Sequence, residues 1–314
     1  MINFRYHVVS LAAVFLALAI GLVVGTAAAN GPLAENLNDQ VNKITNEKQQ
    51  LRDDLDQSRA ELKKSADFAA EVAPMLLNGK LNNRNVLLVK FEGSDDDVNT
   101  ATDGIATTLE TAGAKVVGTI SITEKFTAAA SNLLLLDLSE SWAPPAVSGA
   151  LPNTTNGVET SSALLASVLV GKSGTPQVDG VRTVLSAYEQ AGCVKLRGDF
   201  KAPAEAVIIV AGAPASGKDA KERNTAAMTI ATRFDMAGPT VVAGLSANGL
   251  VSSVRGDASI AKTTSTVDNA VTANGQLAAV MALVERLGGK TGHYGIGDGA
   301  TSLLPKTASV TNGS

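Results

Sequence analysis

The strongest candidate for ligand chemistry is GAPASGKD, residues 212–219. It fits the G-x-x-x-x-G-K spacing of a phosphate-binding loop, follows an apolar segment and precedes a polar one. LLLLD, residues 133–137, resembles the apolar strand whose final aspartate, here Asp137, holds magnesium in such sites. However, Asp219 stands where a hydroxyl should bind the metal, and its carboxylate would repel phosphates. The two segments also come in the wrong order, so a strand-to-helix turn that needs glycine explains residues 212–219 better.

The turn after the first predicted strand, EGSDDDV at residues 92–98, lacks the G-x-G-x-x-G spacing that binds dinucleotides. Its three consecutive aspartates, residues 95–97, would repel a pyrophosphate group. They could bind a cation loosely, but carboxylates are also favourable at the positive end of a helix. We therefore interpret them as a solvated helix start.

Cys193 and His293 are the residue types of a nucleophile and its base. Cys193 lies in AGCVKLRG, between a helix end and a strand, where a small buried residue is expected. Nothing in that segment indicates an activated thiolate. His293 lies in a glycine-rich segment, GGKTGHYGIGDG, which could shape a site or simply turn the chain. No catalytic residue is assigned, and the chain is predicted not to be an enzyme.

Metal ligands are few. One cysteine and two histidines are too few for a Cys/His zinc site within one chain. Copper(I) would need clustered cysteine and methionine, but Met75, Met228, Met236 and Met281 are scattered, so core filling is their predicted use. No cofactor is assigned. A net charge of −4 argues against a nucleic-acid surface, and a single cysteine excludes an internal disulfide.

All of these candidate site residues come after a run without charged side chains, which extends from Val8 to Ala29. An apolar helix of ~20 residues crosses a bilayer, whereas a signal peptide has a shorter apolar region behind a clearly basic start. The residues 27–29 offer a cleavage site, yet the length of the run favours an uncleaved anchor at residues 8–29. Since Arg5 precedes the run and the first acid after it is Glu35, residues 1–7 are expected in the cytoplasm and the bulk of the chain outside it.

Residues 30–73 are predicted to form a helical stalk, since Asn30 can cap a helix and Pro32 suits its first turn. A heptad repeat follows, with the pattern of a homodimeric coiled coil. The alternative is a single amphipathic helix lying on the rest of the chain. Two of the seam positions are polar, which lowers the stability of the coiled coil but can specify the register of its two helices. The seam residues are Leu37, Val41, Ile44, Lys48, Leu51, Leu55, Ser58 and Leu62.

Residues 84–304 are predicted to form an α/β head. Apolar strands alternate with helices, which is typical of a mostly parallel sheet covered on both faces, in a Rossmann-like or flavodoxin-like arrangement. SNLLLLDLSESW, residues 131–142, could be strand or helix. Residues 142–162 are expected to be a loop that could divide the head into two lobes, and residues 305–314 a disordered tail. The predicted strands are 85–91, 114–122, 204–212 and 239–244, and the predicted helices 98–112, 218–234 and 275–287.

Several motifs carry a family resemblance. FRYHVVSLAAVFLALAIGLVVG at residues 4–25, STVDNA at 265–270, GHYG at 292–295 and SLLP at 302–305 resemble the actinobacterial copper-transport outer-membrane protein family. Its mycobacterial member is called MctB and its corynebacterial relatives SteB. The family name implies copper efflux through a pore. The SteB branch implies a membrane-anchored partner of a second membrane protein, SteA, that helps control a peptidoglycan hydrolase during cell division.

The amino-acid composition and the apolar run favour the role that the SteB branch implies. A β-barrel pore needs many alternating strands of ~10 residues with aromatic girdles, whereas only 4% of this chain is aromatic. The single apolar run has no polar stripe to line a channel. We therefore predict a non-enzymatic cell-envelope protein, dimeric through residues 30–73, that binds partners and regulates cell-wall hydrolysis and division. The alternative is copper transport across the envelope, in which case copper would be bound.

Overall fold

The computed structural model describes residues 4–92, 96–172 and 178–306, and for residues 28–35 it describes the backbone alone. The chain divides into two compact units, Met1–Lys64 and Ser65–Ser314. The predicted tail lies almost wholly outside the described residues, as does the first of the three aspartates, Asp95. The longer unit is one compact body, so the predicted division of the head into two lobes is wrong.

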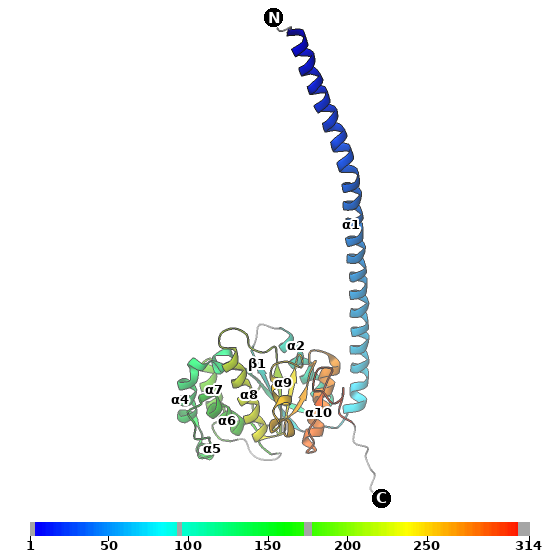
Figure 1. Ribbon diagram of the computed structural model, residues 1–314. Helices are drawn as coiled ribbons and strands as arrows, with labels where there is room; N and C mark the ends of the chain where they lie inside the picture. Colours follow the sequence, from blue (N-terminus) through cyan, green and yellow to red (C-terminus); the bar gives the residue numbers. More distant parts are fainter. Residues whose placement is uncertain (1–3, 93–95, 173–177, 307–314) are drawn as a thin grey trace. The chain divides into compact units, whose positions relative to one another are not determined.

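The helices and strands alternate along most of the longer unit (Figure 1). In chain order they are α1 (Phe4–Leu77), β1 (Asn85–Phe91), α2 (Asp96–Thr111), β2 (Lys115–Ile122), α3 (Glu124–Thr127), α4 (Asn132–Trp142), α5 (Pro145–Ser148), α6 (Gly157–Leu169), α7 (Val181–Gln190), β3 (Val194–Arg197), β4 (Ala206–Ala211), α8 (Ala220–Ala237), β5 (Thr240–Gly244), α9 (Leu250–Gly256), β6 (Ser265–Val267), α10 (Ala273–Leu287) and β7 (His293–Tyr294).

The shorter unit consists of the first part of α1. Its segment Phe4–Ala27 is the one helix among the described residues that is long and apolar enough to cross a membrane. This confirms the predicted apolar helix, although it begins at Phe4 rather than at Val8. No second helix begins at Asn30, because α1 continues through that position.

The longer unit contains one open sheet with the strand order β3-β2-β1-β4-β5-β6-β7. All neighbouring strands run parallel except β2 and β3, so the predicted mostly parallel sheet is confirmed. From β1 the chain proceeds first to β2 on one side and later to β4 on the other. The sheet therefore has a topological switch point between β1 and β4, and ligands of open α/β sheets bind at such points.

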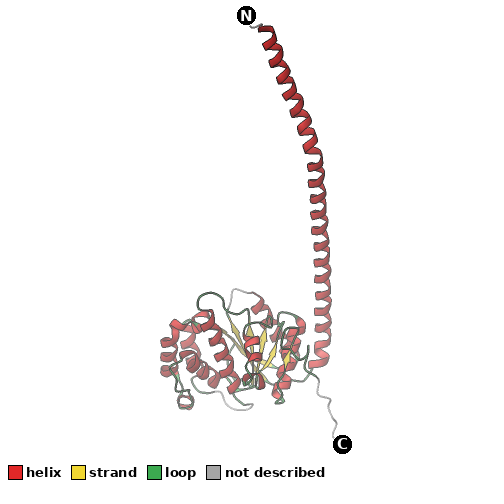
Figure 2. Cartoon of the chain, viewed as in Figure 1, coloured by secondary structure: helices red, strands yellow, loops and turns green. Residues whose placement is uncertain are grey.

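Helices lie on both faces of the sheet (Figure 2). A hydrophobic core lies against each face, because successive strand residues point to opposite sides. In β1, Leu87 and Val89 belong to one core and Val86 and Leu88 to the other. The first core is covered by α4, α6, α7, α8 and α9. The second is covered by α2, α10 and the end of α1, where Leu77 is fully buried. The predicted coverage of both faces is confirmed.

Two segments differ from simple expectations. The ambiguous residues 131–142 are mostly helix α4, with Leu135 and Leu138 buried in the first core and Leu133 exposed. The predicted loop at 142–162 is wrong in part, because it contains α5 and the start of α6. The side chain of Asn156 caps α6 by accepting a hydrogen bond from the backbone N–H of Glu159.

The two sheet edges are short. At one edge β7 has only two residues, and the segment after it returns to pair with it. The backbone N–H of Gly295 donates to the carbonyl of Ser302, and that of Thr301 donates to the carbonyl of His293. At the other edge, β3 has four residues and runs antiparallel to β2, with Lys195 and Arg197 exposed.

Candidate functional site

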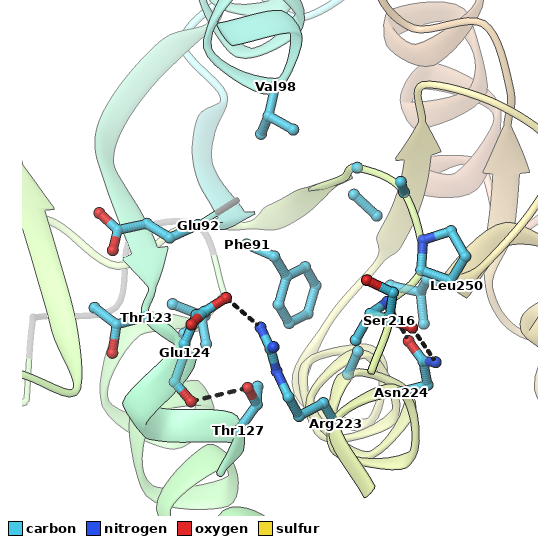
Figure 3. Close-up of a pocket in the computed structure, with 17 residues that line it drawn as sticks. Phe91, Glu92, Val98, Thr123, Glu124, Thr127, Ser216, Arg223, Asn224 and Leu250 are labelled. Atoms are coloured by element: carbon cyan, nitrogen blue, oxygen red, sulfur yellow. Dashed lines mark hydrogen bonds and ion pairs between the residues drawn. The ribbon is translucent and has the colours of Figure 1, made fainter. Parts of the chain in front are cut away.

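A cavity of about 240 Å³ opens where β1, β2 and β4 end (Figure 3). This is the carboxyl edge of the sheet at its switch point, the usual place of a ligand in an open α/β fold. Its walls come from β1, α2, β2, α3, β4, α8 and α9 and from the loop between β4 and α8. The lining residues are Phe91, Glu92, Val98, Ile122, Thr123, Glu124, Thr127, Ala211, Gly212, Ala213, Pro214, Ala215, Ser216, Arg223, Asn224, Ala227 and Leu250.

The loop is the GAPASGKD segment, which connects β4 to α8 as the predicted strand-to-helix turn. Gly217 has a left-handed φ of +91°, a conformation that glycine adopts without cost. Asn224, in the first turns of α8, braces the loop. Its Oδ1 accepts from the N–H of Ala215 at 2.9 Å, and its Nδ2 donates to the carbonyl of Ala215 at 3.4 Å. Lys218 is exposed and does not line the cavity.

The magnesium-binding interpretation of Asp137 is wrong. Asp137 lies on α4 with its side chain exposed, rather than at the end of a strand. It does not line the cavity formed by the GAPASGKD loop. In the apolar run before it, Leu135 is buried in the first core and Leu134 packs against that core, on a helix that contacts α6 and α7.

Two ion pairs set the charge of the cavity. Arg223 donates to the carboxylate of Glu124 at 2.7 Å, and Lys195, on β3, pairs with Glu92 at 2.5 Å. In Figure 3, the Arg223 side chain extends from α8 toward Glu124, close to the ring of Phe91. Sequence reasoning missed Arg223 and Asn224 because each is an ordinary polar residue of a helix until the fold places it beside the loop.

Cys193 and His293 are not brought together. Cys193 directly precedes β3 and His293 lies on β7, at opposite edges of the seven-stranded sheet. Six inter-strand spacings of ~4.8 Å put those edges roughly 29 Å apart. Cys193 is fully buried, as predicted, and burial raises the pKa of its thiol. A nucleophile–base pair of these two residues is therefore excluded by the fold.

The family motifs surround a buried ion pair between Arg255 and Asp268, whose charged atoms are 3.0 Å apart. Asp268 also accepts from the backbone N–H of Ile296 at 2.8 Å and of Gly297 at 3.2 Å. Arg255 donates to the carbonyls of Tyr294 and Asp298, at 2.8 and 2.7 Å. The pair thus joins α9, the end of β6 and the GHYG loop, and it gives the glycine-rich segment a structural role.

Gly295 shows why this segment needs glycine. It has a left-handed φ of +125°, and a Cβ there would lie 2.3 Å from the carboxylate of Asp268. His293 lies next to the same network, with its Nδ1 2.9 Å from the hydroxyl of Thr266. The second interpretation of this loop, that it turns the chain, is the one that the contacts support.

The pH dependence of stability follows from His293. Burial, and then the charge of Arg255, lower the pKa of its imidazole, partly offset by the carbonyl of Ala261. In the unfolded chain the same imidazole takes up its proton at about pH 6.5. The unfolded state therefore binds more protons below that pH, and the free energy of unfolding falls as the pH falls, by at most about 1.4 kcal/mol per pH unit.

We expect His293→Gln to remove this component. Denaturant titrations at several values between about pH 7.5 and pH 5 should show a shallower loss of stability for His293→Gln than for the wild type. His7→Gln, a change at the N-terminus, is the matched control and should follow the wild type. Identical pH slopes for the wild type and His293→Gln would contradict the prediction.

The methionines are only partly in the core. Met281 is buried and Met228 is packed against the first core, as predicted. The prediction is wrong for Met75 and Met236, which are 84% and 71% exposed on outward faces of α1 and α8. No group of three or more His, Cys, Asp or Glu side chains that could hold a metal ion occurs in residues 4–92, 96–172 and 178–306.

An apolar helix of membrane-spanning length and an α/β unit with a switch-point cavity define a membrane-associated α/β protein. The family described as "Copper transport outer membrane protein, MctB" matches residues 1–305, and the chain belongs to this family. Copper transporter MctB of Mycobacterium tuberculosis (strain ATCC 25618 / H37Rv) is 30% identical over 313 residues, which cover 96% of this chain and 99% of that protein. Copper transporter MctB of Mycobacterium leprae (strain TN) is also 30% identical, with the same coverage.

Proposed function

We propose that this protein takes part in copper transport across the cell envelope as a non-enzymatic, membrane-anchored component. The observation that carries the proposal is the similarity to proteins named copper transporter MctB over almost the whole of both chains. The matched segment contains both the apolar helix and the α/β unit. Copper transport was the alternative interpretation of the sequence, and these relatives favour it over control of cell-wall hydrolysis.

The proposed topology is a single pass through the membrane. Phe4–Ala27 remains uncleaved in the bilayer, residues before it face the cytoplasm, and the α/β unit lies in the envelope. This topology is supported by the length of the helix and by the position of Arg5 before the uncharged run that begins at Val8. A Rossmann-like or flavodoxin-like head, as the sequence suggests, would then present the switch-point cavity outside the cytoplasm.

The test is the copper content of cells that lack the gene. Under a copper load, the deletion strain should accumulate more cell-associated copper than the parent, and the full chain should restore the parental level. A chain without residues 4–27 should fail to restore it if the anchor is needed. Cell-associated zinc is the control and should not change. Equal copper contents in the deletion strain and the parent would contradict the proposal.

A second candidate function is the regulation of a peptidoglycan hydrolase during division, as a dimer that binds a SteA-like membrane protein. The supporting observation is the exposure of the apolar seam residues of residues 30–73. Leu37, Val41, Ile44 and Leu51 are 57–69% exposed in the single chain. A stripe of this kind buries its area when two helices pack together.

We expect two lysines in the seam to abolish the homodimer. Ile44→Lys with Leu51→Lys places charges at two d positions, where neither can leave the interface. Asn46→Lys with Gln50→Lys adds the same charge off the seam and should leave a dimer. Chemical cross-linking in native membranes reads out both. A wild-type chain that is monomeric would contradict the coiled coil, and recovery of no wall enzyme or division protein with the dimer would contradict the second function.

A further inference from the structure

The cavity at the switch point is bordered by hydrogen-bond donors that have no partner. The backbone N–H groups of Gly212, Ala213 and Ser216, three residues that line the cavity, have no acceptor among the described residues. The fourth amide, that of Ala215, is already bonded to Asn224. Buried or partly buried amides normally find a partner in the protein, in water or in a ligand. Gly212 is half-buried, whereas Ala213 and Ser216 are exposed, so these three amides are free to donate to water or to a bound acceptor.

Arg223 adds a positive charge to the same wall. Its guanidinium has five N–H donors, of which one Nη group bonds to Glu124 at 2.7 Å. Its Nε is shielded from solvent and has no acceptor. The side chain is 25% exposed, so its remaining Nη donors are held at the wall rather than moving freely in solvent. A guanidinium fixed in this way is suited to an oxyanion.

The acceptors around the cavity are already occupied. The carboxylate of Glu92 is paired with Lys195, and that of Glu124 with Arg223. The Asn224 oxygen accepts from Ala215. The hydroxyl of Thr123 is also bonded, since it donates to the carbonyls of Gly192 and Cys193. Among the side chains that line the cavity, the one buried nitrogen or oxygen atom without a partner is the Nε of Arg223, which is a donor. The unmet requirement of the buried side chains is therefore for an acceptor.

Apolar side chains also line the cavity. They are Phe91, Val98, Ile122 and Leu250, and Figure 3 shows the ring of Phe91 between the Arg223 side chain and Val98. A ligand that fills the cavity has an anionic end and an apolar body. The volume of about 240 Å³ is below the usual range of ~300–1,000 Å³ for drug-sized ligands. The body must therefore be small, of the size of one ring or a short branched chain.

We propose that this cavity binds a small oxyanion with an apolar body, either a carboxylate or a phosphate monoester. The oxyanion accepts from the amides of Gly212, Ala213 and Ser216 and from Arg223, and the body lies against Phe91 and Leu250. No metal ion is needed, so the proposal does not depend on the hydroxyl that the loop lacks at Asp219. It is also independent of the proposed copper transport, because binding of the anion is measured in the absence of copper.

The test uses the full chain in lipid nanodiscs and isothermal titration calorimetry. The probes are benzoate, phenyl phosphate, inorganic phosphate and, as the neutral analogue, benzyl alcohol. We expect benzoate or phenyl phosphate to bind, inorganic phosphate to bind more weakly because it lacks the apolar body, and benzyl alcohol not to bind. Binding of benzyl alcohol as tight as that of the two anions, or no binding of either anion at millimolar concentration, would overturn the proposal. Benzoate against phenyl phosphate separates the two sources of the anion.

Matched variants locate the site. Arg223→Gln should weaken binding of the preferred anion about tenfold or more, because a hydrogen bond to a charged group is lost. Arg233→Gln removes the same charge from α8, where Arg233 pairs with Glu159 outside the cavity, and should bind as the wild type does. Ala227→Leu, which fills the cavity from α8, should abolish binding. Thermal unfolding of each variant confirms its fold, and wild-type affinity in Arg223→Gln or Ala227→Leu would overturn the assignment.

Discussion

Replacing Asp268 with asparagine is expected to lower the free energy of unfolding by about 3–5 kcal/mol, a large share of the ~5–15 kcal/mol typical of a domain. The carboxylate is 1% exposed and the Arg255 side chain 6% exposed, so the substitution leaves a buried cation without its counter-charge. It also weakens the acceptor for the amides of Ile296 and Gly297. Denaturant unfolding followed by the fluorescence of Trp142, the single tryptophan, measures the change.

The matched control is Asp298→Asn on the same loop. Asp298 is exposed, and it is its backbone carbonyl, not its carboxylate, that accepts from Arg255. This variant should unfold within about 0.5 kcal/mol of the wild type, as surface substitutions usually do. If Asp268→Asn were equally mild, the ion pair would not be what holds the GHYG loop.

Two aspartates in the centre of the apolar helix, Leu16→Asp with Ile20→Asp, are expected to release the protein from the membrane. A charged residue at the middle of a membrane-spanning helix costs about 3 kcal/mol relative to an apolar one, so the pair opposes insertion by roughly 6 kcal/mol. None of Phe4–Ala27 is buried within the protein, so no other contact offsets this cost. Fractionation of cells, followed by alkaline extraction of the membranes, measures the membrane-bound share.

The control carries the same two substitutions in the α/β unit. Leu133→Asp and Ile296→Asp replace side chains that are 79% and 72% exposed, and they should leave the protein in the membrane fraction. If the variant with aspartates at positions 16 and 20 stayed with the membrane after extraction, Phe4–Ala27 would not be the segment that attaches the chain.

The parts of the fold that the sequence predicts are those with long, uninterrupted patterns. β1 and β4 contain buried apolar runs of four and six residues, and α10 has clear helical spacing with Gly288-Gly289 after it. Of the short strands, β3 was expected after Cys193, although without bounds, and β6 and β7 were not predicted. Each has two to four residues, too few to establish an alternation, and each exists because a neighbouring strand supplies its hydrogen bonds.

The α6 helix could have been found. Its N-terminus has the pattern N-x-x-E, Asn156 to Glu159, which is a capping signal. The Pro, Asn and Thr residues before it outweighed this signal and led to the loop assignment. By contrast, nothing local distinguishes Leu133–Asp137 as helix rather than strand, since an apolar run of that length fits either. Its packing on α6 and α7 decides the matter.

Of the candidate site, only the strand-to-helix turn could be predicted from the sequence. GAPASGKD was recognised as a strand-to-helix turn, and the structure confirms that it joins β4 to α8. The cavity depends on contacts between distant segments, such as Arg223 with Glu124, 99 residues apart. Likewise, the role of Arg255 follows only from the fold, which places β6 and the GHYG loop beside α9. Such pairings are properties of the tertiary structure and leave no periodic trace in the sequence.

The edges of the sheet have a consequence for proteins held in one membrane plane. Anchoring concentrates many copies in a thin layer, where an open strand edge could recruit a neighbour and grow a fibrous aggregate. Here the two-residue β7 is already occupied by Thr301 and Ser302, and β3 presents Lys195 and Arg197. Neither edge strand is long, flat and uncharged, so neither readily pairs with a strand of a second chain. Copies of the protein can therefore lie close together at a membrane surface without joining their sheets edge to edge.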